Sequence, residues 1–317
     1  MLKKILLMIG IFFVLIFTLI VIFYKIFLSS PSSFIPDTII NIETGKNINQ
    51  IFSLLEEKNI IRDKRIAKVI LYLKQDKIIP AGYYHFPKRI SVIEVVDRLR
   101  HGDYGQEKKR VTIPEGLNVR QIVEILAHNL DNFSKEEFIS LTEGKEGFLF
   151  PDTYFFFPQA TSEDIIKAME DNFERQTIEL KEETLRQGKN WREIVIIASL
   201  IELEASQAEA RRMISDIIWR RLKINMPLQI DAVFPYIMGK NTFELTLEDL
   251  QYDSPYNTYR YRGLPPGAIA NPSLDSLEAT LYPIPNEYWY YLSDKEGNMH
   301  YTITHDEHLK NKQKYLR

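Results

Sequence analysis

The sequence predicts an α+β chain with a single N-terminal helix that is long enough to span a membrane. Three observations support this class. An uncharged apolar run opens the chain, strand and amphipathic helix patterns then alternate, and a strongly apolar helix carrying two glutamates follows in the second half. The chain has 317 residues, which suits about two domains. Its net charge of -3 indicates no nucleic-acid partner, and without cysteine it has no disulfide or thiolate metal site.

The apolar run extends from Ile5 to Tyr24 without a charged residue, and about 20 such residues span a bilayer. Two lysines precede the run and one follows it, which favours a cytoplasmic N-terminus with the bulk of the chain on the extracytoplasmic side. A cleaved signal peptide is the alternative, but its apolar region would be shorter and would end at a small-residue cleavage site. We therefore expect a cytoplasmic N-terminus and retained anchor over residues 1–30 and a linker over residues 31–37.

Two segments recur at a shift of 71 residues and indicate a duplicated unit. Gly45–Leu55 reads GKNINQIFSLL, and Gly116–Leu126 reads GLNVRQIVEIL. The same shift aligns two aromatic runs and the serine beyond each, namely Tyr83–Pro87 with Tyr154–Pro158 and Ser91 with Ser162. Each copy is expected to run from a strand through a glycine turn and a capped helix to an aromatic strand and a second helix.

The expected helices begin after the N-caps Asn47 and Asn118. The expected strands are Thr38–Ile42, Gly82–Phe86, Arg110–Ile113 and Thr153–Phe157. The later helices are Asp63–Gln75, Val92–Arg100 and Glu163–Arg175. The aromatic strands either pack in a core or present tyrosines that stack on sugar faces, and the sequence leaves both open.

The most informative segment is Ile194–Glu204, which reads IVIIASLIELE within a helix expected over Arg192–Ser206. A helix that is apolar on all sides is buried, and a glutamate in it is costly unless it is paired, protonated or used in function. Burial raises the pKa of a carboxyl group, as a general acid near neutral pH requires.

The two acids of this helix project roughly 200° apart, so we expect one cleft to use only one of them. Glu202 has small neighbours that leave room for a ligand, whereas Glu204 lies beside bulkier side chains. The alternative is a structural ion pair between Glu202 and Arg211 or Arg212.

A second helix is expected over Glu209–Lys223, with solvated arginines, and a short one over Leu245–Leu250. Gln229 and Asp231 lie between them and are two further candidates for binding the substrate. The segment Ser254–Ser273 then forms a loop stiffened by prolines and turned by glycines. Its amide, hydroxyl and aromatic side chains suit a carbohydrate; the candidates are Tyr256, Asn257, Thr258, Tyr259 and Asn271. The alternative is a loop that only wraps the core.

Other classes of site have weaker support. His305 and His308 are spaced as on one helix face, but the sequence has no HExxH motif, so we expect no metal site. No phosphate-binding loop, dinucleotide fingerprint or nucleophile elbow is present, and we expect no cofactor.

Five motifs together resemble the YceG-like family of endolytic murein transglycosylases: ASLIELEA, LQID, SPYNTY, GLPPGAIANP and EGFLFPDTY. The resemblance covers nearly the whole chain. It implies a LysM-like module over residues 38–108 and a catalytic domain over 109–317. The chain departs from the family pattern at Leu203, where lysine is usual, at Ala232, and at Ser273, where glycine is usual.

The family resemblance implies a single-pass protein of the bacterial cell membrane whose partners are peptidoglycan glycan strands and, as candidates, peptidoglycan synthases. It also implies Glu202 as the catalytic residue. We expect Glu202 to protonate the oxygen between N-acetylmuramic acid and N-acetylglucosamine. As a carboxylate it then removes the C6 hydroxyl proton, which leaves a 1,6-anhydro end. Tyr256, Asn257 and Gln229 are candidates to stabilise the positive charge that develops on the sugar as the bond breaks.

Two other functions remain open at this point. A muramidase would hydrolyse the same bond with two carboxyl groups, and Asp231 would then be the second acid. A non-enzymatic scaffold would bind the wall through the LysM-like module and dock synthases. If the protein binds sacculi but releases no fragments, that result would distinguish the scaffold from either enzyme.

Overall fold

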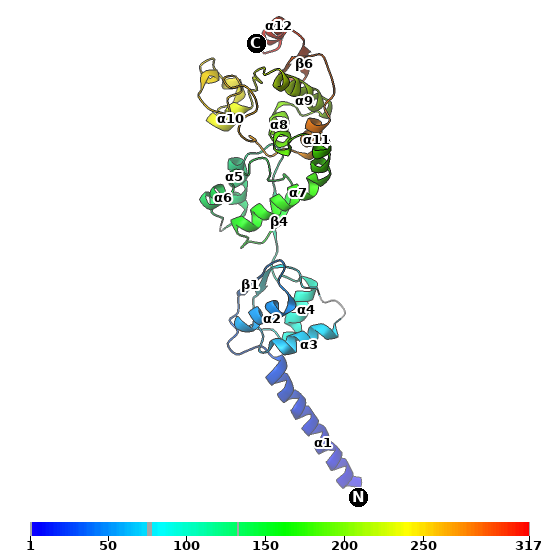
Figure 1. Cartoon of the computed structure of the whole chain (residues 1–317). Coiled ribbons are helices and arrows are strands. Elements are labelled where there is room, and N and C mark those ends of the chain that lie inside the picture. The colour runs from blue at the N-terminus through cyan, green and yellow to red at the C-terminus, as the bar shows by residue number, and fades with distance from the viewer. Residues whose placement is uncertain (1, 75–77, 132, 317) are drawn as a thin grey trace. The chain divides into compact units, whose positions relative to one another are not determined.

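The computed structural model describes residues 2–74, 78–131 and 133–316, and it confirms a mixed α+β chain (Figure 1). The chain divides into two compact units, Met1–Lys108 and Lys109–Arg317. Each unit has its own apolar core, and the residues that line the candidate site all belong to the second.

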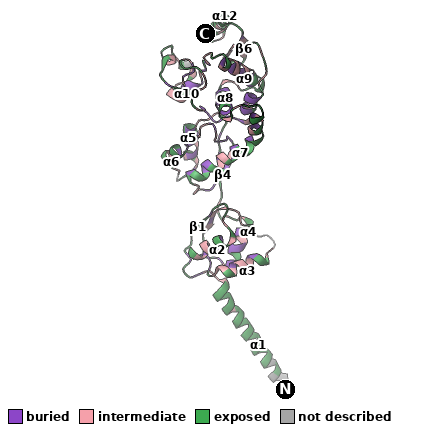
Figure 2. Ribbon diagram, in the orientation of Figure 1, coloured by how far each residue is buried: buried purple, intermediate pink, exposed green. Residues whose placement is uncertain are grey.

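The first unit opens with α1 (Leu2–Phe23), which continues into a π-helical turn, η1 (Tyr24–Leu28). The described side chains of α1 are exposed almost throughout, and the helix is drawn green in Figure 2. The segment Leu7–Leu28 has a mean hydropathy of 2.9, so it is long and apolar enough to cross a membrane. Which side of a membrane the remaining chain occupies stays a prediction.

The rest of the first unit is a two-stranded antiparallel sheet packed against three helices. Its elements are β1 (Thr38–Ile42), α2 (Ile48–Glu57), α3 (Lys64–Leu73), β2 (Gly82–Phe86) and α4 (Val92–His101). Both predicted strands are confirmed, with Thr38 opposite Phe86. Tyr84 and Phe86 are fully buried, so the aromatic strand supplies core residues here.

The second unit begins with the same arrangement. Its elements are β3 (Lys109–Thr112), α5 (Val119–Asn129), α6 (Lys135–Leu141), β4 (Thr153–Phe156) and α7 (Ser162–Arg186). The strands pair antiparallel with Lys109 opposite Phe156. The helix α7 extends well past the predicted end at Arg175, because buried residues recur along it as far as Thr184.

The two copies share local bonding that supports duplication. Asn47 and Asn118 each form a capping box at the start of a helix. The Tyr84 hydroxyl donates to the carbonyl four residues before it at 2.8 Å, and the Tyr154 hydroxyl does the same at 2.6 Å. These tyrosines are 70 residues apart, so the shift of 71 is wrong by one residue in this strand.

The same one-residue difference recurs at the next helix cap. Ser91 caps α4, but its counterpart at α7 is Thr161, and the aligned residue Ser162 is the first residue of the helix. The structure therefore places a one-residue deletion in the second copy before its aromatic strand.

The remainder of the second unit is mostly helical, with one hairpin. Its helices are α8 (Trp191–Glu204), α9 (Ala208–Lys223), α10 (Val233–Met238), α11 (Leu274–Leu281) and α12 (His305–Tyr315), and the hairpin joins β5 (Tyr290–Ser293) to β6 (Met299–Thr302). The helix α8 is buried from Ile194 to Ile201 and packs against α7, α9 and α11.

Two expectations for this region are wrong. The segment Leu245–Leu250 is no α-helix; the backbone forms two 3-10 turns, η2 (Thr242–Glu244) and η3 (Asp249–Gln251). The Asn257 amide binds the Leu250 and Tyr252 carbonyls and so ends the second turn. The arginines of α9 are also not all solvated, since Arg211 and Arg221 are buried.

Candidate active site

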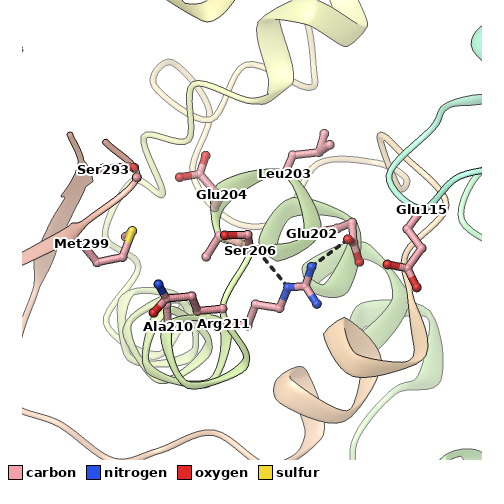
Figure 3. A pocket seen from close by; sticks show the side chains of 12 residues that line it. Glu115, Glu202, Leu203, Glu204, Ser206, Ala210, Arg211, Ser293 and Met299 are labelled. Carbon is pink, nitrogen blue, oxygen red and sulfur yellow. Dashed lines mark hydrogen bonds and ion pairs between the residues drawn. The ribbon is translucent and has the colours of Figure 1, made fainter. Parts of the chain in front are cut away.

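A cavity of about 560 Å³ opens where α8 ends and α9 begins (Figure 3). The residues that line it come from the ends of these helices, from the β5–β6 hairpin and from the turn before α5: Glu115, Glu202, Leu203, Glu204, Ala205, Ser206, Gln207, Ala210, Arg211, Ser293, Gly297 and Met299. Three of these lining residues are glutamates, and Arg211 is the basic residue beside them.

Glu202 is well enclosed, with only 5% of its side chain exposed. One carboxylate oxygen accepts a bond from the Arg211 guanidinium at 3.0 Å. The other accepts from the Ser273 backbone amide at 2.8 Å and from the Ser273 hydroxyl at 2.5 Å. The ion pair with Arg211 considered from sequence is therefore formed, whereas Arg212 binds the Tyr282 carbonyl instead.

Arg211 links Glu202 to two other segments. Its guanidinium also donates to Asp275 at 2.6 Å and to the Ala205 carbonyl at 2.9 Å. Charge-assisted bonds of this kind are stronger than neutral ones and fix the geometry of both partners. The arrangement holds Glu202 at a defined position on the cavity wall.

Ser273 couples Glu202 to the start of α11. Its hydroxyl accepts the Ser276 amide as the N-cap of that helix and donates to Glu202. The departure from glycine noted in the sequence thus lies against the predicted catalytic carboxyl group. A glycine would keep the backbone bond but would lack the hydroxyl.

Glu204 lines the same cavity, contrary to the expectation that one cleft would use only one acid. The helix ends at Glu204, so the cavity wraps around its last turn. Burial raises the pKa of Glu204 to about 7, and the nearby negative charge of Asp231 adds to this effect. The Tyr291 hydroxyl, the Ala232 amide and Arg221 oppose it.

The predicted carbohydrate-binding residues of the loop are mostly committed to internal bonds. Asn257 and Asn271 are buried and bind backbone groups, and the Thr258 hydroxyl bonds to both backbone groups of Ile230. The Asn271 oxygen accepts the Gly147 and Leu149 amides, each at 2.9 Å. The structure therefore uses these three polar side chains to brace the loop.

Among the described residues, the other predicted substrate residues do not line the cavity either. The Tyr259 hydroxyl donates to Asp231, and Tyr256 packs against Tyr236. Gln229 is exposed and adopts a positive φ of 52°. Its backbone amide donates to the Thr258 carbonyl. The structure thus gathers Asp231 and Tyr259 around Glu204 and keeps Gln229 at the surface.

The sequence reading missed Glu115, which lies in the turn between β3 and α5. Its side chain reaches the cavity beside Glu202 (Figure 3). The signal in the sequence was a Pro-Glu-Gly turn directly after a strand, a place where polar side chains often serve function. Sequence pattern alone identifies this turn only as a connection between the strand and the capped helix.

The C-terminal histidines have other partners. His300 pairs with Asp294 at 2.9 Å, and His305 and His308 pack on the ring of Tyr290. Burial lowers the pKa of His308 to about 4. Among the residues that the structure describes, no group of three or more potential metal ligands is gathered.

Comparison with known proteins places this architecture in a family. A model of the YceG-like family matches residues 40–314. The endolytic murein transglycosylase of Bacillus subtilis is 32% identical over 305 residues, which are 87% of this chain and 84% of that protein. The endolytic murein transglycosylase of Streptococcus pneumoniae strain D39 is 28% identical over 318 residues, but the match covers only 57% of its length.

A crystal structure of a yceG-like protein from Listeria monocytogenes superposes with a TM-score of 0.59 at 27% identity. The match covers 87% of this chain and 99% of that one. Sequence motifs, family model and fold therefore agree, and the chain belongs to the YceG-like family.

Proposed function

We propose that this protein is a membrane-anchored endolytic murein transglycosylase, a lyase that cuts the glycan strands of nascent peptidoglycan. The observation that carries the proposal is Glu202, a buried and hydrogen-bonded carboxyl group at the wall of an open cavity. The names of the relatives from Bacillus and Streptococcus support the substrate class.

The reaction uses Glu202 as an acid and then as a base. Its proton goes to the oxygen that joins N-acetylmuramic acid to N-acetylglucosamine, and the C1–O bond breaks. The carboxylate then takes the proton of the muramoyl C6 hydroxyl as O6 bonds to C1. The product is a 1,6-anhydro end, and no water is consumed, in contrast to hydrolysis by two carboxyl groups.

Substrate binding divides between two groups of residues. Gln229 is exposed and is the candidate for a direct contact with the glycan. Tyr256, Asn257, Thr258 and Asn271 act indirectly in this proposal, because their polar groups or rings support the loop that carries Ser273. Asp231 and Tyr259 support the position of Glu204.

The remaining parts of the proposal concern location. Residues 1–30 anchor the protein in the cell membrane, residues 38–108 form a LysM-like module on the extracytoplasmic side, and residues 109–317 carry the chemistry. The apolar, exposed α1 supports the anchor. Anchoring would keep the active domain near newly made strands and the synthases that produce them.

The test is digestion of purified sacculi with the full-length protein, followed by mass spectrometry of the released fragments. The proposal predicts 1,6-anhydro ends, which are lighter than reducing ends by one water. Reducing ends would instead show a muramidase, and binding without fragments would show a scaffold. The variant Glu202→Gln should fold and release nothing, while Glu278→Gln on the exposed face of α11 serves as a control.

A further inference from the structure

Glu115 is held next to Glu202 by the backbone. The turn is fixed to the segment that also holds Glu202: the Gly116 amide donates to the Asn271 carbonyl at 3.0 Å, and the Asn271 amide donates to the Leu117 carbonyl at 2.9 Å. Gly116 has a φ of 76°, and a Cβ atom there would lie 3.4 Å from Cγ of Glu202. Figure 3 shows the Glu115 carboxyl group directed toward that of Glu202.

The charged groups around Glu115 include more carboxylates than cations. The groups that act on it are Glu202 of α8, Asp275 of α11 and Arg211 of α9. Three carboxyl groups thus share one guanidinium, and Arg211 already bonds to two of them. Within the described part of the chain, the Glu115 side chain forms no hydrogen bond or ion pair. Neighbouring like charges disfavour full ionisation, so a proton is best placed on the carboxyl group without a donor.

The raised pKa of Glu115 agrees with placing the proton on this group. Partial burial raises its pKa, the charges of Glu202 and Asp275 raise it further, and Arg211 opposes the shift. Glu202, by contrast, accepts three hydrogen bonds, one of them from the Arg211 guanidinium. Carboxyl groups whose surroundings push their proton affinities apart commonly divide the acid and base roles between them.

Resting on the proposed function, we propose that Glu115 stores the proton that Glu202 delivers to the glycosidic oxygen. In the resting cavity Glu115 carries the proton and Glu202 is the anion held by Arg211 and Ser273. The proton passes to Glu202 as substrate binds, and Glu202 gives it to the leaving oxygen as the C1–O bond breaks. Glu202 then takes the C6 hydroxyl proton as the O6–C1 bond forms and returns it to Glu115. No proton is gained or lost over the cycle, and Glu115 acts through Glu202.

The test compares pH–rate profiles of the full-length wild type, Glu115→Gln and Glu115→Asp, with Glu278→Gln as an exposed control. The wild-type rate should fall on the alkaline side when the stored proton is lost. In Glu115→Gln the proton must reside on Glu202 itself, so the alkaline limb moves to lower pH. The rate at neutral pH should fall by about 10²-fold, the usual scale of acid–base assistance. Glu115→Asp should restore part of the lost rate. It should also move the alkaline limb part of the way back to its wild-type pH.

A rate that falls equally at every pH, with the alkaline limb unmoved, would assign Glu115 a structural role and overturn the proposal. An unchanged rate would do the same. A thermal unfolding midpoint near that of wild type shows that each variant is folded, and Glu115→Asp carries the test if Glu115→Gln does not fold.

A second readout separates this proposal from the proposed function. Carboxyl ¹³C shifts of glutamate-labelled protein, titrated in detergent and assigned by comparison with Glu115→Gln and Glu202→Gln, show which group holds the proton without any substrate. Glu115 should titrate at higher pH than Glu202, and the reverse order would refute the proton store. Product analysis of the wild type tests the transglycosylase reaction independently.

Discussion

Glu202 and Glu204 lie two residues apart on α8 and reach the same cavity, yet their surroundings differ in kind. Glu202 is surrounded by donors, namely the Arg211 guanidinium and the amide and hydroxyl of Ser273. Glu204 is surrounded by the acid Asp231 and by tyrosine hydroxyls, and burial raises its pKa to about 7. The comparison shows that position on a helix does not decide the role of an acid; its partners from distant segments do.

The difference suggests distinct tasks for the two sides. The Glu202 side is a charged network that opens to the cavity and includes Glu115, Arg211 and Asp275. The Glu204 side is a buried polar cluster that ties α8 to the segment of Asp231 and to the β5–β6 hairpin. In the function proposed above, the first side carries the chemistry and the second supports the fold. Four substitutions can break or sharpen this division.

Removing the guanidinium should have the largest effect on stability. Arg211→Met leaves Glu202 buried without its cation, and breaking such a pair costs about 3 kcal/mol or more. Arg212→Met on the same helix removes one exposed bond to a carbonyl and should cost about 1 kcal/mol. Urea unfolding of both variants measures the difference. Equal losses would show that the Arg211 network does not stabilise the fold.

Glu204→Gln should change how stability depends on pH. In the folded state Glu204 keeps its proton up to a pKa of about 7, whereas the ordinary value is 4.5. The folded state therefore binds more protons than the unfolded state between these values, and stability falls as pH rises through that window. The loss is about 2 kcal/mol once partial exposure is allowed for.

The measurement for Glu204 is the unfolding midpoint at pH 5 and at pH 8. Glu204→Gln should lose less stability over this range than wild type, although Glu146 contributes in the same direction because burial raises its pKa to about 7 as well. A pH dependence identical to that of wild type would contradict the assignment.

Gly116→Ala tests the close contact on the Glu202 side. Alanine at a φ of 76° is strained by about 1–2 kcal/mol, and its Cβ would press on Glu202 and Leu203. Gly144→Ala is the matched control, since Gly144 has a φ of 75° and open space around it. Both variants carry the strain of the positive φ, and Gly116→Ala should lose somewhat more stability because of its added contacts. Only Gly116→Ala should slow glycan cleavage. Equal rates would remove this turn from the catalytic geometry.

Tyr259→Phe should have the smallest effect. It removes the hydroxyl that donates to Asp231 and should cost about 1 kcal/mol with little change in cleavage rate. Tyr261→Phe removes an exposed hydroxyl bond to Asp253 at 2.6 Å and should cost less. A large loss of rate in Tyr259→Phe at unchanged stability would move the Glu204 side into the chemistry.

Local patterns predicted much of this fold. The strands of the first unit, the caps Asn47 and Asn118 and the buried run of α8 were all predicted, because each depends on residues close in sequence. The pairing of Glu202 with Arg211 was also open to sequence reasoning, since only nine residues separate them.

The missing parts depend on long-range contacts. Ser273 meets Glu202 across 71 residues, and Asn271 meets Gly147 across 124. No periodicity in the sequence indicates such a contact, so the sequence alone marks Ser273 only as a departure from the family pattern and predicts Asn271 as a sugar ligand. The approach of Glu115 to Glu202 and the shared cavity of the two α8 acids were hidden for the same reason.

The most direct test of the division is a count of anhydro-ended fragments released from sacculi by matched amounts of folded Glu202→Gln and Glu204→Gln protein. Our account predicts that Glu202→Gln releases essentially none, whereas Glu204→Gln releases the wild-type fragments at a rate within a few fold of wild type. Anhydro ends from Glu202→Gln, together with their loss in a folded Glu204→Gln, would contradict it and move the chemistry to the other side of α8.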